Sequence, residues 1–186
     1  VLLETHRLFD FVDTEADLTP YKLVILPDAI RLDESLRQRL IAYREQGGRL
    51  LLTGRSGLWT EREEPALDIG VRFEGASPLE RGYLIPEYPA VNGRTAYVVY
   101  APTYRIAATG GQVAAQLRDP YFNRTYAHFC SHQHAPDQPG TERPGAILTA
   151  DTAYVAFDAF EDYARNGAYY VRELLHYLIE TLIGDR

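Results

Sequence analysis

The stretch that most constrains the fold is residues 21–57, which predict a strand, a helix and a second strand in succession. Residues 22–26 and 49–53 are short apolar runs, typical of strands buried on both faces of a parallel sheet. Between them, apolar residues recur at helical spacing, Asp33 can cap the start of the helix, and Gly47 can end it in a left-handed conformation. Because parallel strands need a crossover connection, the stretch predicts a βαβ unit.

Composition restricts the class of protein. A length of 186 residues with 46% apolar residues suits a single domain with a real core, and a net charge of −7 argues against a nucleic-acid partner. One cysteine excludes an internal disulfide and fits a reducing compartment, so we expect a cytoplasmic location. No apolar run approaches the ~20 residues that span a bilayer, so no membrane partner is expected.

The beginning of the chain suggests a piece of a larger protein. The sequence contains no methionine, and residues 1–8 resemble the tail of an amphipathic helix. A doubly wound sheet normally has a strand before such a helix. We therefore expect residues 1–186 to form one domain of a longer chain, with an upstream strand missing.

The remaining elements extend this prediction. Residues 9–13 alternate apolar and acidic side chains and predict a strand, as do residues 71–74 and 96–100. Residues 104–117 predict a hairpin around a Thr-Gly-Gly turn, and residues 145–157 predict two further strands. A helix follows, with apolar side chains at helical spacing from Val171 to Leu182. The predicted fold is α/β and flavodoxin-like: a three-layer sandwich with a mostly parallel sheet and an added β-hairpin region.

The turn after the second strand, Gly54-Arg-Ser-Gly57, is a candidate nucleophile site. Open α/β sheets place ligands at the carboxyl ends of their strands, and a sharp turn there can expose a serine beside backbone N–H groups. Ser56 with a histidine such as His132 would make a small hydrolase. The spacing departs from Gly-x-Ser-x-Gly, and a serine in a polar turn usually has no catalytic role.

A second candidate lies in residues 128–134, where metal-ligating side chains are spaced by two: His128, Cys130, His132 and His134. On a strand they would share one face, and Asp137 or Glu142 could complete a zinc site. Neighbours on one face stand about 6.5 Å apart, so the four converge only if the strand bends. The alternative is an imidazole-rich segment packed at a surface.

Acidic and tyrosine-rich segments have similarly open interpretations. Asp158, Glu161 and Asp162 could supply acid–base chemistry on a glycoside, or could begin a helix whose dipole they favour. The 14 tyrosines suit interfaces and sugar-binding surfaces, or the core beneath irregular loops.

Two segments resemble a known family. Leu-Pro-Asp after the first strand, together with Gly-Gly-Arg-Leu-Leu-Leu-Thr-Gly-Arg-Ser-Gly at residues 47–57, resembles the β-galactosidase trimerisation domain. That domain is a class I glutamine amidotransferase-like module found after the barrel of some glycoside hydrolases. Residues 120–134 are similar to a C-terminal region of uncharacterised glycoside hydrolases.

The resemblance implies a non-catalytic accessory and oligomerisation domain of a β-galactosidase-like enzyme. Its partners would be other copies of itself, as a trimer by analogy, the catalytic barrel of the parent chain, and carbohydrate. True amidotransferases carry a cysteine where this chain has Gly54, Arg55 and Ser56, and His-Pro-Glu where it has Asp158, Ala159 and Phe160. We therefore expect no catalytic residue, metal or cofactor. The candidate binding residues are Tyr121, Asn123, Arg124, His128, His132 and His134.

Overall fold

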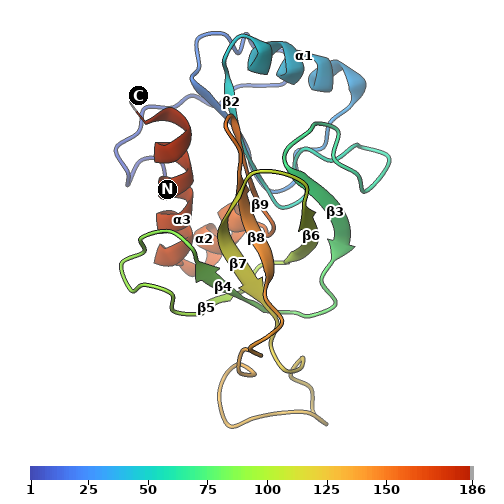
Figure 1. Ribbon diagram of the computed structural model, residues 1–186, viewed down its shortest axis with the longest axis vertical. Helices are drawn as coiled ribbons and strands as arrows, with labels where there is room; N and C mark the ends of the chain where they lie inside the picture. The colour runs from blue at the N-terminus through green and yellow to red at the C-terminus, as the bar shows by residue number, and fades with distance from the viewer. Residues whose placement is uncertain (185–186) are drawn as a thin grey trace.

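The computed structural model describes residues 1–184 and consists of nine strands and three helices over that range (Figure 1). In chain order the elements are β1 (Leu23–Leu26), α1 (Glu34–Glu45), β2 (Arg49–Thr53), β3 (Val71–Ala76), β4 (Gly82–Pro86), β5 (Tyr97–Val99), β6 (Tyr104–Ala108), β7 (Gln112–Arg118), β8 (Arg143–Leu148), β9 (Thr152–Val155), α2 (Ala159–Asn166) and α3 (Tyr169–Ile183).

The predicted βαβ unit is confirmed as β1, α1 and β2. The two strands pair in parallel from Leu23 opposite Arg49 onward. The Asp33 carboxylate caps α1 by accepting a hydrogen bond from the Leu36 N–H at 2.8 Å. Gly47 follows the helix with a φ of 92°, which only glycine adopts at little cost. The long C-terminal helix is also confirmed, as α3.

The predicted fold class is wrong. The main sheet has seven strands in the order β1-β2-β9-β8-β7-β4-β5, and only the β1–β2 and β2–β9 pairs are parallel. The other four pairs are antiparallel, so the sheet is mixed and largely antiparallel. In a flavodoxin-like or amidotransferase-like sandwich, a crossover helix connects each pair of neighbouring parallel strands. Among the described elements of this chain, only α1 connects two neighbouring strands in this way. The rest of the sheet is built from antiparallel returns of the chain.

Several local predictions can be compared with the structure. The strands predicted at residues 71–74 and 96–100 are confirmed, as are the two antiparallel strands within residues 145–157. The hairpin predicted at residues 104–117 is wrong, because β6 pairs with β3 in a separate two-stranded sheet while β7 pairs with β4 and β8. The strand predicted at residues 9–13 and the helix tail at residues 1–8 are also wrong: the segment forms turns and irregular backbone.

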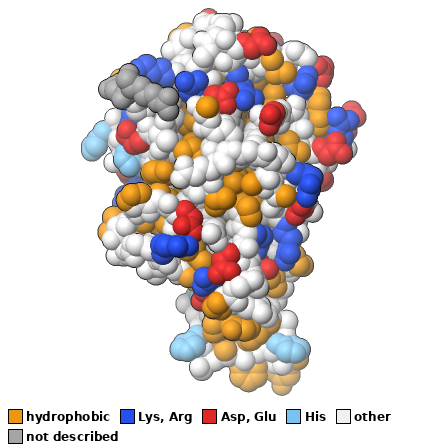
Figure 2. Space-filling view, viewed as in Figure 1, with side chains coloured by type: hydrophobic (Ala, Val, Ile, Leu, Met, Phe, Trp, Pro, Cys, Tyr) orange, Lys and Arg blue, Asp and Glu red, His pale blue; other side chains and the backbone are white. Residues whose placement is uncertain are grey.

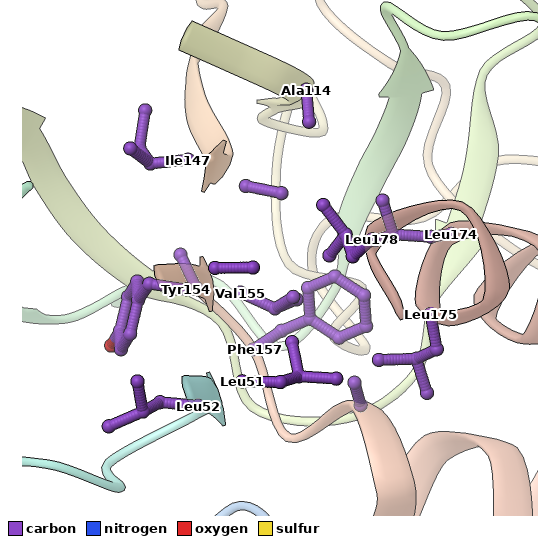
Figure 3. Close-up of a cluster of buried hydrophobic side chains, with 14 of the residues drawn as sticks. Leu51, Leu52, Ala114, Ile147, Tyr154, Val155, Phe157, Leu174, Leu175 and Leu178 are labelled. Carbon is purple, nitrogen blue, oxygen red and sulfur yellow. The ribbon is translucent and has the colours of Figure 1, made fainter. Parts of the chain in front are cut away.

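The core lies between the main sheet and α3. Phe157, at the end of the segment after β9, is fully buried, and Figure 3 shows its ring among Leu51, Leu175 and Leu178. Side chains alternate along β2 and β9, so Leu52 and Tyr154 lie on the opposite side of the sheet from Leu51. In Figure 1, α2 and α3 flank this sheet on one side and the β3–β6 ribbon lies on the other.

Within residues 1–184, none of the helices is both long enough and apolar enough to cross a membrane.

Candidate functional site

The three parallel strands bring their carboxyl ends together at one edge of the sheet. Asp28 follows β1 there, and Thr53 ends β2. The Thr53 hydroxyl donates to Asp28 Oδ1 at 2.6 Å and accepts from the Asp28 N–H at 2.8 Å. The same carboxylate accepts the Phe160 and Glu161 N–H groups at 3.2 and 2.7 Å, which are free backbone donors at the start of α2. Asp28 therefore joins the ends of two strands to a helix.

Asp158 fills the remainder of this edge. Its side chain is 9% exposed and accepts a hydrogen bond from the Tyr104 hydroxyl at 3.0 Å. A Cβ built on Gly54 would lie only 2.1 Å from Asp158 Oδ1, so the carboxylate occupies the space that a side chain at position 54 would need. The edge where a parallel sheet would offer a ligand site is thus closed by the chain's own groups.

The pKa of the buried Asp158 carboxyl is raised. Burial is the main reason that its pKa rises to about 6, and the nearby carboxylates of Asp28 and Glu161 raise it further. The hydrogen bond from Tyr104 and the charge of Arg55 act in the opposite direction. Asp158 therefore gains a proton in the folded protein at a pH where the unfolded chain has lost it.

This shift predicts a pH dependence of stability. Since the folded pKa lies above the unfolded value, the native state binds more protons between about pH 4 and 6, and its stability falls as pH rises through that window. In the wild type this fall amounts to up to about 3 kcal/mol in the free energy of unfolding, and Asp158→Asn should abolish it. Urea denaturation from pH 4 to 7.5 measures the difference between variant and wild type. Tyr104→Phe removes a bond that lowers the pKa, so it should move the fall to higher pH; a flat difference curve for Asp158→Asn would contradict the assignment.

Ser56 does not present a nucleophile. Its side chain is fully buried, and its hydroxyl accepts a hydrogen bond from the Ile30 N–H at 2.9 Å. His132, the histidine proposed as its partner, is exposed on a loop between β7 and β8. The hydrolase hypothesis therefore has no support in the geometry of this turn.

The three carboxylates after β9 begin α2, as the simpler interpretation predicts. Asp158 is the N-cap residue, and Glu161 forms an ion pair with Arg165 one turn later at 2.8 Å. Asp162 is 1% exposed and accepts hydrogen bonds from Asn166 Nδ2 and the Tyr100 N–H. These contacts give each carboxylate a structural role.

A second candidate region is the β7–β8 loop (residues 119–142), which projects from the body of the molecule (Figure 1). Its root is held by ion pairs: Arg118 contacts Asp137 and Glu142, and Asp119 contacts Arg143. The Asp119 N–H also donates to Thr141 Oγ1 at 3.0 Å. These contacts join the two ends of the loop and give it a fixed base.

The loop tip is apolar and exposed. Tyr126 is fully exposed and Phe129 is 73% exposed. Tyr121 is 56% exposed but lies nearer the root, where its N–H donates to the Pro136 carbonyl. Figure 2 shows hydrophobic side chains gathered at this end of the molecule, with histidine on either side. Most other tyrosines are at least partly buried, which makes Tyr126 at the tip a candidate contact residue.

The structure separates the predicted histidine set. His128 and His132 are exposed, whereas His134 is partly buried and its Nε2 lies 2.9 Å from the Tyr100 hydroxyl. Over residues 1–184 no group of three or more histidine, cysteine or carboxylate side chains is placed to hold a metal ion. The zinc hypothesis therefore gains no support.

A cavity of about 250 Å³ lies at the root of the loop and brings part of the predicted set together. Asn123, Arg124 and His134 line it, whereas Tyr121, His128 and His132 do not. Glu80 and Arg81 complete one wall from just before β4. Sequence patterns missed these two residues, because β4 itself was not predicted and charged residues beside a glycine carry no motif.

Comparison with known proteins supports the resemblance in part. The family model of the β-galactosidase trimerisation domain matches residues 1–69, which include β1, α1 and β2. The α-L-fucosidase isoenzyme 2 from Paenibacillus thiaminolyticus is 38% identical over 99% of the chain, with a TM-score of 0.94. The chain is similar to a module of glycoside hydrolases. It spans 28% of the length of that fucosidase.

More distant structures share the fold. A β-galactosidase from Rahnella sp. R3 matches 95% of the chain, which covers 26% of that enzyme, at 19% identity and a TM-score of 0.60. The exo-β-1,4-mannosidase Op5Man5 from Opitutaceae bacterium strain TAV5 matches 97% of the chain, which covers 28% of that enzyme, at 12% identity and a TM-score of 0.56. No match was found among proteins with curated functions. These two structures show a shared fold, whereas the similarity to a module of glycoside hydrolases rests on the family model and on the 38% identical fucosidase. None of these matches supports the amidotransferase-like assignment.

Proposed function

We propose that the chain is a non-catalytic accessory and oligomerisation module, residues 1–186 forming one domain of a β-galactosidase-like glycoside hydrolase. The observation that carries this proposal is the 38% identity to a fucosidase over 99% of the chain, which spans 28% of that enzyme. The buried hydroxyl of Ser56 and the closed edge at Asp28 and Asp158 are consistent with a module that leaves the chemistry to a catalytic barrel elsewhere in the parent. The single free cysteine, Cys130, is consistent with a cytoplasmic location.

The tip of the β7–β8 loop is the proposed contact with a neighbouring subunit. Tyr126 and Phe129 offer large apolar area with few rotatable bonds, and aromatic side chains of this kind dominate interface energetics. The ion pairs of Arg118 and Asp119 at the root fix the direction of the loop before contact, which limits the entropy lost on binding. His128, His132 and Tyr121 would take part in the same contact, beside the neighbour's sugar site.

A second exposed apolar surface lies on the N-terminal segment. Leu3, Leu8 and Phe11 are each more than three-quarters exposed, and the Phe11 ring packs edge-to-face on Phe9 at 5.4 Å. This segment is remote from the loop tip in Figure 1. We propose that it packs on the catalytic barrel of the same chain. A contact between the loop tip and an unlike surface of the neighbour would close a ring, as in the trimer that the family's name describes.

The double variant Tyr126→Ala/Phe129→Ala tests the assembly role. Loss of two aromatic contacts should weaken self-association of the parent enzyme at least about tenfold, without lowering its thermal stability as a dissociated subunit. Size-exclusion chromatography with light scattering over a concentration series measures the effect. Val91→Ala, at another exposed apolar site, is the matched control and should leave association unchanged. A parent enzyme that is strictly monomeric at all concentrations would disprove the assembly role.

A further inference from the structure

The cavity at the root of the β7–β8 loop has walls from two separate parts of the chain. Glu80 and Arg81 precede β4, and Phe122, Arg124, Gln133 and His134 belong to the two arms of the loop. Its volume of about 250 Å³ is below the ~300–1,000 Å³ of sites for drug-sized ligands. A ligand of about one ring fits such a space. We propose that this cavity binds a single sugar ring.

The chemistry of the lining matches a polyhydroxylated ligand. The Glu80 carboxylate only accepts hydrogen bonds, the Arg124 guanidinium only donates them, and the Gln133 amide does both. Each sugar hydroxyl can both donate and accept a hydrogen bond, so sugar hydroxyls can pair with all three of these groups. The Phe122 ring adds an apolar surface for the C–H face of a sugar. The lining carries the carboxylate of Glu80 and the two guanidinium groups of Arg81 and Arg124, so it offers hydrogen-bonding groups of both charges.

The walls are held in place by contacts that leave these groups available. Asn123 links the two sides: its Oδ1 accepts the Glu80 N–H at 2.8 Å and its Nδ2 donates to the Pro78 carbonyl at 3.0 Å. One Arg124 nitrogen, Nη1, donates to the Gln133 carbonyl and ties the two arms of the loop. No hydrogen bond of the Glu80 carboxylate or the Gln133 amide to another described residue is present, so both can face a ligand. A preformed site loses little entropy on binding.

Two of the lining residues, Arg81 and His134, both contact Tyr100. The Arg81 guanidinium lies 5.5 Å from the centre of the Tyr100 ring and donates to the Tyr100 carbonyl at 3.2 Å. The Tyr100 hydroxyl contacts His134 Nε2 at 2.9 Å. Burial, followed by the charges of Arg81 and Arg124, lowers the pKa of His134. His134 thus adds a polar ring to the cavity.

Titration of the ¹⁵N-labelled chain with methyl β-galactopyranoside, methyl α-fucopyranoside and methyl α-mannopyranoside, followed by NMR, tests the proposal. At least one of these should give saturable shifts at Arg81, Arg124 and Gln133 with a dissociation constant in the millimolar range. The double variant Glu80→Ala/Gln133→Ala should weaken binding about tenfold, because both side chains lose hydrogen bonds to the ligand. Val91→Ala, at an exposed site outside the cavity lining, is the control and should bind as the wild type does.

Two outcomes would overturn the proposal: no saturable shifts up to about 50 mM sugar, or equal loss of binding in Val91→Ala. Well-dispersed spectra of the double variant establish that it folds. The cavity lies within one chain, so this test does not depend on self-association. If the protein is monomeric but binds sugar, only the assembly role is disproved. If it is oligomeric but binds no sugar, only the sugar site is disproved.

Discussion

Replacing Gly54 by alanine is expected to lower the free energy of unfolding by about 2–5 kcal/mol. Gly54 has a φ of 61°, a conformation that costs an L-residue roughly 1–2 kcal/mol. A Cβ there would also lie 2.1 Å from Asp158 Oδ1 and 2.7 Å from the Asp28 carbonyl oxygen. The first atom could move with its side chain, but the second belongs to the backbone. Overpacking of this kind adds about 1–3 kcal/mol.

Gly167→Ala separates the two causes. Gly167 has the same φ of 61° at the end of α2, but its Cβ would meet nothing within 4 Å. Chemical denaturation of both variants should show a loss of about 1–2 kcal/mol for Gly167→Ala and a clearly larger one for Gly54→Ala. Equal losses would mean that the edge between Asp28 and Asp158 has room for a side chain, and so for a ligand.

Truncation of Phe157 to alanine should cost about 3–5 kcal/mol. The ring is fully buried between the main sheet and α3, so its removal leaves a cavity that close-packed neighbours such as Leu51 and Leu178 fill only in part. The same substitution at the exposed Phe11 should change stability by less than about 0.5 kcal/mol. Urea midpoints at constant m-value measure both. A loss below about 1 kcal/mol for Phe157→Ala would show that this region repacks freely.

The parts of the fold that sequence patterns predicted are those determined by nearby residues. The cap at Asp33, the left-handed Gly47 and the apolar stripe of α3 each act within a few residues, and each is present. Strand pairing is different, because a partner can lie anywhere in the chain. The turn after β6 suggested a hairpin, yet β6 pairs with β3, which ends at Ala76. The alternation in residues 9–13 predicted a strand, but no partner lies beside that segment in the described chain.

The same distinction between local and long-range relations explains which parts of the candidate site could be predicted. Local spacing indicated that the loop holding His128–His134 was unusual, and it is the most exposed projection of the molecule. Local spacing could not show that His134 turns inward to Tyr100, or that Arg81 approaches from before β4. The burial of Ser56 depends on the Ile30 N–H, which lies after a different strand. Such relations arise only when the sheet has formed.

The role of Asp28 has a consequence for protein engineering. One carboxylate links the ends of β1 and β2 to the start of α2, so the turn at Gly54 lies where these three elements are held together. An active nucleophile there would require breaking the hydrogen bond of the Ser56 hydroxyl and removing the Asp158 side chain. Both changes would weaken the contacts that hold the three elements together. New specificity is better grafted onto the β7–β8 loop, whose arms can vary while the ion pairs of Arg118 and Asp119 keep their ends in place.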